Sequence, residues 1–163
     1  MNLQTPVIFS KASFDITHHS TVLLFGSCFS ENIGLKLKEN KFSVNVNPFG
    51  VLYNPFSIFA AINRLLNKQM FTRDEFIHHN DSYHSFMHHG SFSNINHDDA
   101  VVHVNEEFSL ASKQLDVADF LLITFGTSYV FRWKETGTIV GNCHKIPANL
   151  FVRQRLTVDE ITS

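Results

Sequence analysis

The sequence predicts an α/β fold with a parallel sheet, and two observations support this. Two apolar runs, Thr21–Phe25 and Asp119–Phe125, each stop at a glycine, which is typical of buried strands. Between them lie segments whose apolar residues recur at helical spacing. Because strands alternate with helices, we expect parallel pairing through right-handed crossovers.

The first strand, Thr21–Phe25, is followed by a predicted helix over about 30–40. Phe29, Ile33 and Leu37 recur at i, i+4 and i+8 and form its expected apolar face. Residues 42–46 then alternate with period two, which predicts a second strand. This strand ends in Asn47-Pro48-Phe49-Gly50, a turn composition.

A second helix is expected from Pro55, because Asn54 suits the N-cap and proline suits the first helical position. Its expected apolar face consists of Ile58, Phe59, Ile62, Leu65 and Leu66. Thr72 and Glu75 have the spacing of a capping box, which predicts a short helical turn.

Residues 77–97 are rich in His, Asn, Ser and Asp, which favours a loop or an irregular hairpin. A third helix is predicted over about 98–115, with Asp98 and Asp99 at the positive end of its dipole. Its expected buried face consists of Val104, Phe108, Ala111 and Leu115.

The second half of the chain begins with the apolar run over 119–125, which we expect to be the central strand. Residues 130–140 predict a hairpin that turns at 135–137, followed by a loop over 141–145. Thr157 and Glu160 form a second capping-box pattern close to the last residue. A helix start placed there leads us to expect the N-terminal portion of a longer domain.

Composition limits the class of protein. The chain has 163 residues, enough for one domain over 1–163, and a net charge of -2 without a basic stripe, which excludes nucleic acid as the expected partner. No apolar run approaches the roughly 20 residues that span a bilayer. Residues 1–6 lack the pattern of a signal peptide, and two cysteines are too few for a disulfide framework. We therefore expect a cytoplasmic protein.

Histidine is abundant, with ten residues that include three adjacent pairs. None has the spacing of a known zinc motif, so we expect surface and loop histidines. The sequence gives no reason to expect a metal or another cofactor.

Three predicted strand ends carry glycine and small polar residues: Gly26-Ser27, Asn47–Gly50 and Gly126–Ser128. In a parallel sheet these ends meet at one edge, where α/β folds bind ligands. Ser27 would lie at a helix N-terminus, where developing negative charge is stabilised. It would either attack an acyl carbonyl with the help of a histidine or simply cap the helix.

Five segments resemble the GSCFA domain family. They are GSCFSENIG (26–34), NPFGVLYNP (47–55), HSFMHHGSFS (84–93), ITFGTSYVF (123–131) and GNCHKIP (141–147). They occur in the family's order and span most of the chain. That family is similar to the SGNH, or GDSL-like, hydrolases, which are esterases and acyl hydrolases.

This resemblance implies a three-layer α/β/α, flavodoxin-like architecture. It implies that Ser27 is the nucleophile and that the backbone N–H groups of Ser27 and Gly50 bind the oxyanion. SGNH enzymes add an asparagine from a Gly-x-Asn-Asp block, whose place is taken here by Gly126-Thr127-Ser128-Tyr129. Ser128 or Asn142 would then be the substitute donor.

The resemblance also implies an Asp-x-x-His block near the C-terminus, which supplies the general base. No such pattern follows Ser128. We therefore expect the base beyond residue 163, and a chain that cannot complete the triad alone. Removing the base from such a triad costs several orders of magnitude in rate.

Other residues near the expected site have two interpretations each. His144 would bind substrate or serve as a structurally hydrogen-bonded loop residue. Cys28 is expected in the core rather than at the site. Tyr53, Tyr83, Phe86, Tyr129 and Trp133 form either a substrate-binding wall or part of the core.

Two functions remain open at this point. The first is a serine esterase that acts on a small-molecule, glycan or lipid ester. The second is a ligand-binding α/β domain without catalysis, which the missing third-block asparagine favours.

Overall fold

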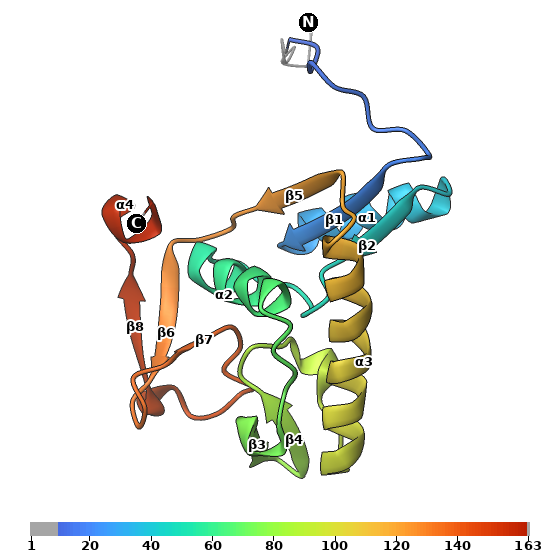
Figure 1. The fold of residues 1–163 in the computed structure, drawn as a ribbon. Helices are drawn as coiled ribbons and strands as arrows, with labels where there is room; N and C mark the ends of the chain where they lie inside the picture. The colour runs from blue at the N-terminus through green and yellow to red at the C-terminus, as the bar shows by residue number, and fades with distance from the viewer. Residues whose placement is uncertain (1–9, 163) are drawn as a thin grey trace, which may run out of the picture.

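The structure is a computed structural model and describes residues 10–162 (Figure 1). The segment 1–6, considered above for a signal peptide, lies outside these residues. The strands are β1 (Thr21–Gly26), β2 (Ser43–Val46), β3 (Phe76–His79), β4 (Ser82–Ser85), β5 (Phe120–Thr124), β6 (Tyr129–Trp133), β7 (Ile139–Val140) and β8 (Phe151–Arg155). The helices are α1 (Cys28–Glu39), α2 (Pro55–Leu66), α3 (His97–Leu115) and α4 (Val158–Thr162).

A parallel sheet with the strand order β2-β1-β5 confirms the predicted α/β class. β1 lies in the middle, pairing Val22 with both Val44 and Phe120. All its residues from Val22 to Phe25 are buried, as expected for a strand covered on both faces.

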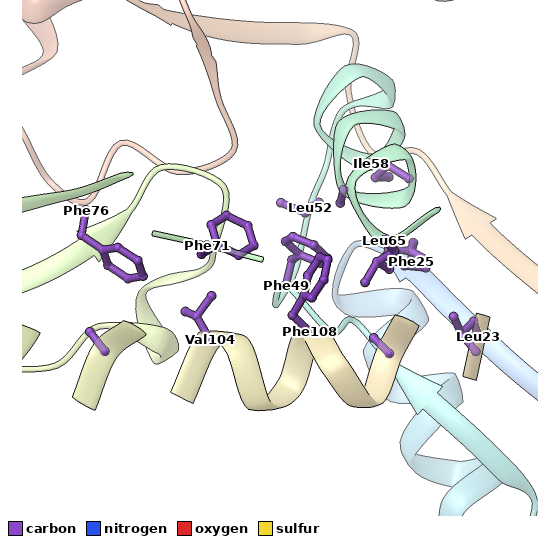
Figure 2. Close-up of a cluster of buried hydrophobic side chains, with 13 residues drawn as sticks. Leu23, Phe25, Phe49, Leu52, Ile58, Leu65, Phe71, Phe76, Val104 and Phe108 are labelled. Atoms are coloured by element: carbon purple, nitrogen blue, oxygen red, sulfur yellow. The ribbon is translucent and has the colours of Figure 1, made fainter. Parts of the chain in front are cut away.

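Side chains of β1 alternate between two apolar clusters. Leu23 and Phe25 belong to the larger cluster, which is filled mainly from the segment before α2, from α2 itself and from α3 (Figure 2). Val22 and Leu24 pack on the other side with Val44 and with Leu37 of α1. Because successive side chains of a strand point to opposite faces, and both faces of β1 are covered, the consecutive residues from Val22 to Phe25 are all apolar.

Helix α3 has the face that the sequence predicts. Val104, Phe108 and Ala111 are buried, and the Phe108 ring lies against the rings of Phe49 and Phe71 (Figure 2). Asn96 caps the helix, accepting hydrogen bonds from the N–H groups of Asp98 and Asp99.

The predicted apolar face of α1 is wrong. Phe29 and Ile33 are exposed, whereas Ser30 and Gly34 are buried. A Cβ at Gly34 would lie 2.3 Å from a methyl group of Val46, so the helix approaches β2 too closely for a larger side chain. Small residues therefore face the sheet, and spacing alone could not reveal this. The same close packing leaves Cys28 exposed rather than in the core, which corrects that expectation as well.

β5 is also not the central strand among the described residues. It pairs with β1 alone and lies at the edge of the sheet, where Leu121 and Ile123 are about 40% exposed. An edge strand with apolar residues on both faces looks central in the sequence, because composition does not report which neighbours are present.

The remaining strands form two smaller sheets. β3 and β4 make an antiparallel hairpin within the segment predicted as a loop or irregular hairpin. β6 pairs with β7, as predicted for 130–140, and also with β8. Both capping boxes are present: Glu75 accepts a hydrogen bond from the Thr72 N–H at 2.8 Å, and Glu160 accepts one from the Thr157 N–H at 2.7 Å.

Among residues 10–162, no helix has the length and apolar content that a membrane crossing requires.

Candidate active site

The three polar strand ends meet at one edge of the parallel sheet, as predicted. In the sheet register Gly26 of β1 lies opposite Thr124 of β5, and Leu24 lies opposite Val46 of β2. Two hydrogen bonds join the turns that follow: the Gly26 N–H donates to Asn47 Oδ1 at 2.9 Å, and the Leu52 N–H donates to the Gly26 carbonyl at 2.9 Å.

Ser27 is half-buried and forms the N-cap of α1. Its extended backbone (φ -77°, ψ -176°) lets Oγ accept a hydrogen bond from the Phe29 N–H at 3.3 Å. Its own N–H donates to Thr124 Oγ1 at 3.4 Å, a long bond. Ser27 therefore caps the helix in this structure, at the position where the helix dipole would also stabilise an oxyanion.

Glycine is required at position 26 of β1 because Thr124 of β5 leaves no room for a side chain there. Gly26 has φ +145°, and a Cβ there would lie 2.3 Å from Thr124 Oγ1 and 2.4 Å from the Thr124 carbonyl oxygen. Beneath this turn the hydroxyls of Ser30 and Thr124 are 2.7 Å apart. Thr124 thus contacts both the Ser27 N–H and the first turn of α1.

The turn that ends in Gly50 is closed. The Gly50 N–H donates to the Asn47 carbonyl at 2.6 Å, and Gly50 itself has φ +75°. A Cβ at this position would lie 2.2 Å from Cβ of His89, so glycine is required here too. Because the amide already has a partner, this turn must open before Gly50 can bind an oxyanion.

Ser128 and Asn142, the expected substitute donors, lie in different surroundings. The Ser128 carbonyl accepts a hydrogen bond from the Leu156 N–H at 2.9 Å. Asn142 Oδ1 accepts one from the His144 N–H at 2.8 Å, and the Asn142 N–H donates to the Phe86 carbonyl at 3.2 Å. Among the described residues, neither makes a hydrogen bond with Ser27 or Gly50.

His144 is buried and holds the 141–147 loop against the β3–β4 hairpin. Its Nε2 lies 2.8 Å from the Ser85 carbonyl, and its ring stacks on His84 with centroids 4.6 Å apart. Burial is the main reason that the pKa of His144 falls to about 4. The ring is therefore neutral at pH 7, and these contacts correspond to the structural alternative.

The five aromatic residues considered as a wall lie in separate places. Phe86 and Trp133 pack together in the cluster beneath β6 and β8. Tyr83 stacks on His97, and Tyr129 lies under the guanidinium of Arg153. Of the five, Tyr53 contacts the strand ends: its carbonyl accepts hydrogen bonds from the N–H groups of Gly126 and Thr127. Tyr53 is 45% exposed.

His88 and His144 lie in loops, as expected for histidines, but they are buried rather than at the surface. The His88 ring is buried, stacks on Phe49, and places Nδ1 2.9 Å from Ser85 Oγ. Both cysteines are free, and burial raises the pKa of the Cys143 thiol.

The structure adds two residues that the sequence analysis did not select, Thr124 and His89, and gives Asn47, known there only as part of a strand end, a specific contact. Asn47 follows β2 and Thr124 ends β5, the two strands that flank β1, so the rule that placed Ser27 at this edge could also have selected Thr124. His89 is exposed, and its N–H donates to the Phe49 carbonyl at 2.8 Å. It reaches the Gly50 turn from the β3–β4 side of the molecule, which no sequence signal indicates.

Two surface depressions lie away from these strand ends. One, of about 600 Å³, runs along α3 beside Val102 and Leu110, and the other, of about 320 Å³, lies beside Phe59 and Asn63 of α2. No group of three metal-ligating side chains occurs among residues 10–162.

A comparison with models of known families gives one match, described as the GSCFA family, over residues 21–163. The chain belongs to the GSCFA family. The matched region of this GSCFA chain contains all five motifs quoted above and the whole parallel sheet. No curated protein and no solved structure matches it.

Proposed function

We propose that this GSCFA-family chain carries the nucleophile of a serine hydrolase that cleaves ester bonds. The observation that carries the proposal is the place of Ser27: its hydroxyl caps α1 at the edge where the Gly26, Asn47 and Thr124 strand ends meet. A serine hydroxyl placed there would attack an acyl carbonyl beside the backbone N–H groups of the helix N-terminus, which are donors suited to the resulting oxyanion.

In this mechanism Ser27 Oγ forms a bond to the carbonyl carbon and passes its proton to a histidine, which then protonates the departing alkoxide. Water then attacks the acyl group on Ser27 in the same way, giving its proton to the histidine. The bond to Oγ breaks, the histidine returns the proton to Ser27, and the carboxylic acid is released. The Ser27 N–H binds the oxyanion, because its present bond to Thr124 is long. The Gly50 N–H joins it once the turn releases the Asn47 carbonyl. We propose that Ser128 or Asn142 reaches the oxyanion hole only after rearrangement.

The finer features of the family resemblance belong to the same proposal. A three-layer, SGNH-like architecture is supported by the packing of β1 residues on both faces of the sheet. A small-molecule, glycan or lipid ester is the proposed substrate, with the exposed Tyr53 as a contact. Two free cysteines agree with a cytoplasmic location.

Fluorophosphonate labelling tests the proposal. We expect the full-length protein to be labelled at Ser27 and its Ser27→Ala variant to lose the label. Ser43→Ala, which changes an exposed serine of β2, is the matched control and should label normally. Label that persists in Ser27→Ala, or that never forms on the protein, would overturn serine catalysis.

A second candidate is a ligand-binding domain without catalysis. One observation favours it: the Gly50 N–H is already paired at 2.6 Å, so one of the two proposed oxyanion donors is occupied. This candidate predicts no label, whereas an ester analogue would still shift the amide resonances of Ser27 and Tyr53.

A further inference from the structure

Asn47 connects the two turns of the candidate site through three hydrogen bonds. Its side-chain Oδ1 accepts the Gly26 N–H at 2.9 Å, and its own N–H donates to the Leu24 carbonyl at 2.8 Å. Its carbonyl accepts the Gly50 N–H at 2.6 Å. One residue therefore contacts the Leu24 carbonyl of β1, the N–H of Gly26 and the proposed second oxyanion donor.

The backbone of Asn47 makes this arrangement possible. Its φ is +48°, in the left-handed region that asparagine adopts more readily than most residues. In this conformation the chain leaves β2 and turns back, so that side chain and carbonyl each meet one of the two turns. An aliphatic side chain would lose the Oδ1 acceptor and strain the backbone as well.

The side-chain nitrogen of Asn47, Nδ2, has no hydrogen-bond partner among the described residues. It is also buried, since Asn47 is 6% exposed. Burying a donor without a partner is unfavourable. Because Oδ1 is fixed by the Gly26 N–H, exchanging the two amide atoms would remove the one bond the side chain makes. The side chain is therefore retained for the acceptor it presents to Gly26.

We propose that Asn47 is a positioning residue that fixes the Ser27 turn relative to the Gly50 turn. Its catalytic consequence rests on the proposed hydrolase function, whereas its structural part does not. Asn47 does not touch the substrate. It holds the Gly26 peptide, and through it Ser27, at a constant distance from the amide of residue 50.

The first experiment measures amide hydrogen exchange at Gly26 by NMR and compares Asn47→Gly with Asn80→Gly. Both substitutions replace a left-handed asparagine by the residue that best tolerates that conformation, but Asn80 (φ 46°) is exposed in the β3–β4 turn. We expect exchange at Gly26 to become about tenfold faster or more in Asn47→Gly and to stay unchanged in Asn80→Gly. A Gly26 exchange rate within about twofold of the wild type in a folded Asn47→Gly would overturn the proposal.

The second experiment measures the rate of fluorophosphonate labelling of the full-length protein. We expect Asn47→Gly to label about ten- to a hundredfold more slowly, because small displacements of a reacting group cost rates of this order. A protein that is not labelled at all would refute the hydrolase function, and the exchange measurement would still decide the positioning role. Normal labelling together with faster exchange at Gly26 would overturn the catalytic part of the inference alone.

Asn47→Asp supplies a conservative rescue and a second variant if Asn47→Gly does not fold. A carboxyl oxygen keeps the acceptor for the Gly26 N–H, so exchange there should stay slow. Ionisation of this buried carboxyl adds a negative charge beside the developing oxyanion. The ratio of its labelling rate to that of the wild type should therefore be near one at low pH and fall as the pH rises. A flat ratio near that of Asn47→Gly would contradict the proposal.

Discussion

Gly26 shows how one missing side-chain atom permits the candidate site. Gly26 lies so close to the Thr124 backbone that a Cβ cannot fit there, and its φ of +145° favours glycine independently. Close approach at this point is what allows the Ser27 N–H and the Thr124 hydroxyl to meet.

We expect Gly26→Ala to lower the free energy of unfolding by about 3 kcal/mol or more, because both steric overlap and backbone strain oppose it. Gly90→Ala is the matched control, since a Cβ at Gly90 would meet no atom within 4 Å. Urea unfolding should place that variant within about 1 kcal/mol of the wild type. Equal stabilities for the two variants would contradict the packing described here.

His88 is a residue whose charge state and packing are coupled. Burial lowers its pKa to about 3, helped by the nearby positive charge of Arg64. An unfolded histidine has a pKa of about 6.5. The unfolded state therefore binds more protons between these values, and the contribution of His88 to stability is present above pH 6.5 and is lost as the pH falls.

Below pH 6.5 the free energy of unfolding should therefore decrease by up to about 1.4 kcal/mol per pH unit for this histidine. His88→Phe keeps a ring between Phe49 and Phe71 but cannot be protonated, so its slope should be shallower. Urea titrations at pH 7, 6 and 5 measure the slope of each protein. His144 contributes equally to both slopes, so its effect cancels in the comparison. Identical slopes would show that His88 is not the responsible group.

At the scale of elements, helices α1 and α3 use different physical means to cover the sheet. α3 buries the apolar residues Val104, Phe108 and Ala111 at i, i+4 and i+7, so its amphipathic pattern identifies the buried face. α1 buries Ser30 and Gly34, because it lies against β2 with almost no space between them. Its apolar residues Phe29 and Ile33 consequently remain exposed.

Phe108→Ala should lower the free energy of unfolding by about 3–5 kcal/mol, since it empties the contact between α3 and the rings of Phe49 and Phe71. Val102→Ala on the exposed side of the same helix is the control and should change stability by no more than about 0.5 kcal/mol. Denaturant unfolding followed by circular dichroism measures both. A small loss for Phe108→Ala would indicate that α3 is not held in the core at this residue.

At the scale of the whole molecule, the parallel sheet and the β6–β8 sheet are joined through the hairpin segment. Phe86 packs with Trp133 and Phe151, while the Gly141 N–H donates to the Phe86 carbonyl at 2.7 Å. Gly141 also lies close to Leu52, whose N–H is bound to Gly26. Contacts therefore run continuously from Trp133 to the candidate site.

Because of this continuity we expect one cooperative unfolding transition. Trp133 is the single tryptophan, so its fluorescence reports the β6–β8 sheet, whereas far-UV circular dichroism reports mainly the helices. The two signals should give the same urea midpoint and slope. Separate midpoints would show that the two sheets unfold independently.

Much of the fold could be predicted from local patterns. Helix α3, the strand pair β6–β7, both capping boxes and the existence of α2 depend on residues close in sequence, so their signals need no tertiary information. The apolar face predicted for α2 is only partly correct, because Phe59 and Leu66 are exposed. The edge position of β5 could not be predicted, because it depends on which strands pair with it. The burial of His88 and His144 depends on contacts with Phe49 and Ser85, from other parts of the chain.

The sequence by itself determined the alternation of strands and helices, and hence that Gly26-Ser27, Asn47–Gly50 and Gly126–Ser128 share one edge. Parallel pairing alone requires this, whatever the side chains do. Only the tertiary structure decided that the Gly50 amide is paired, that Asn47 joins the two turns and that small residues face the sheet from α1. These features depend on distances of a few ångströms between segments remote in sequence, which no local pattern encodes.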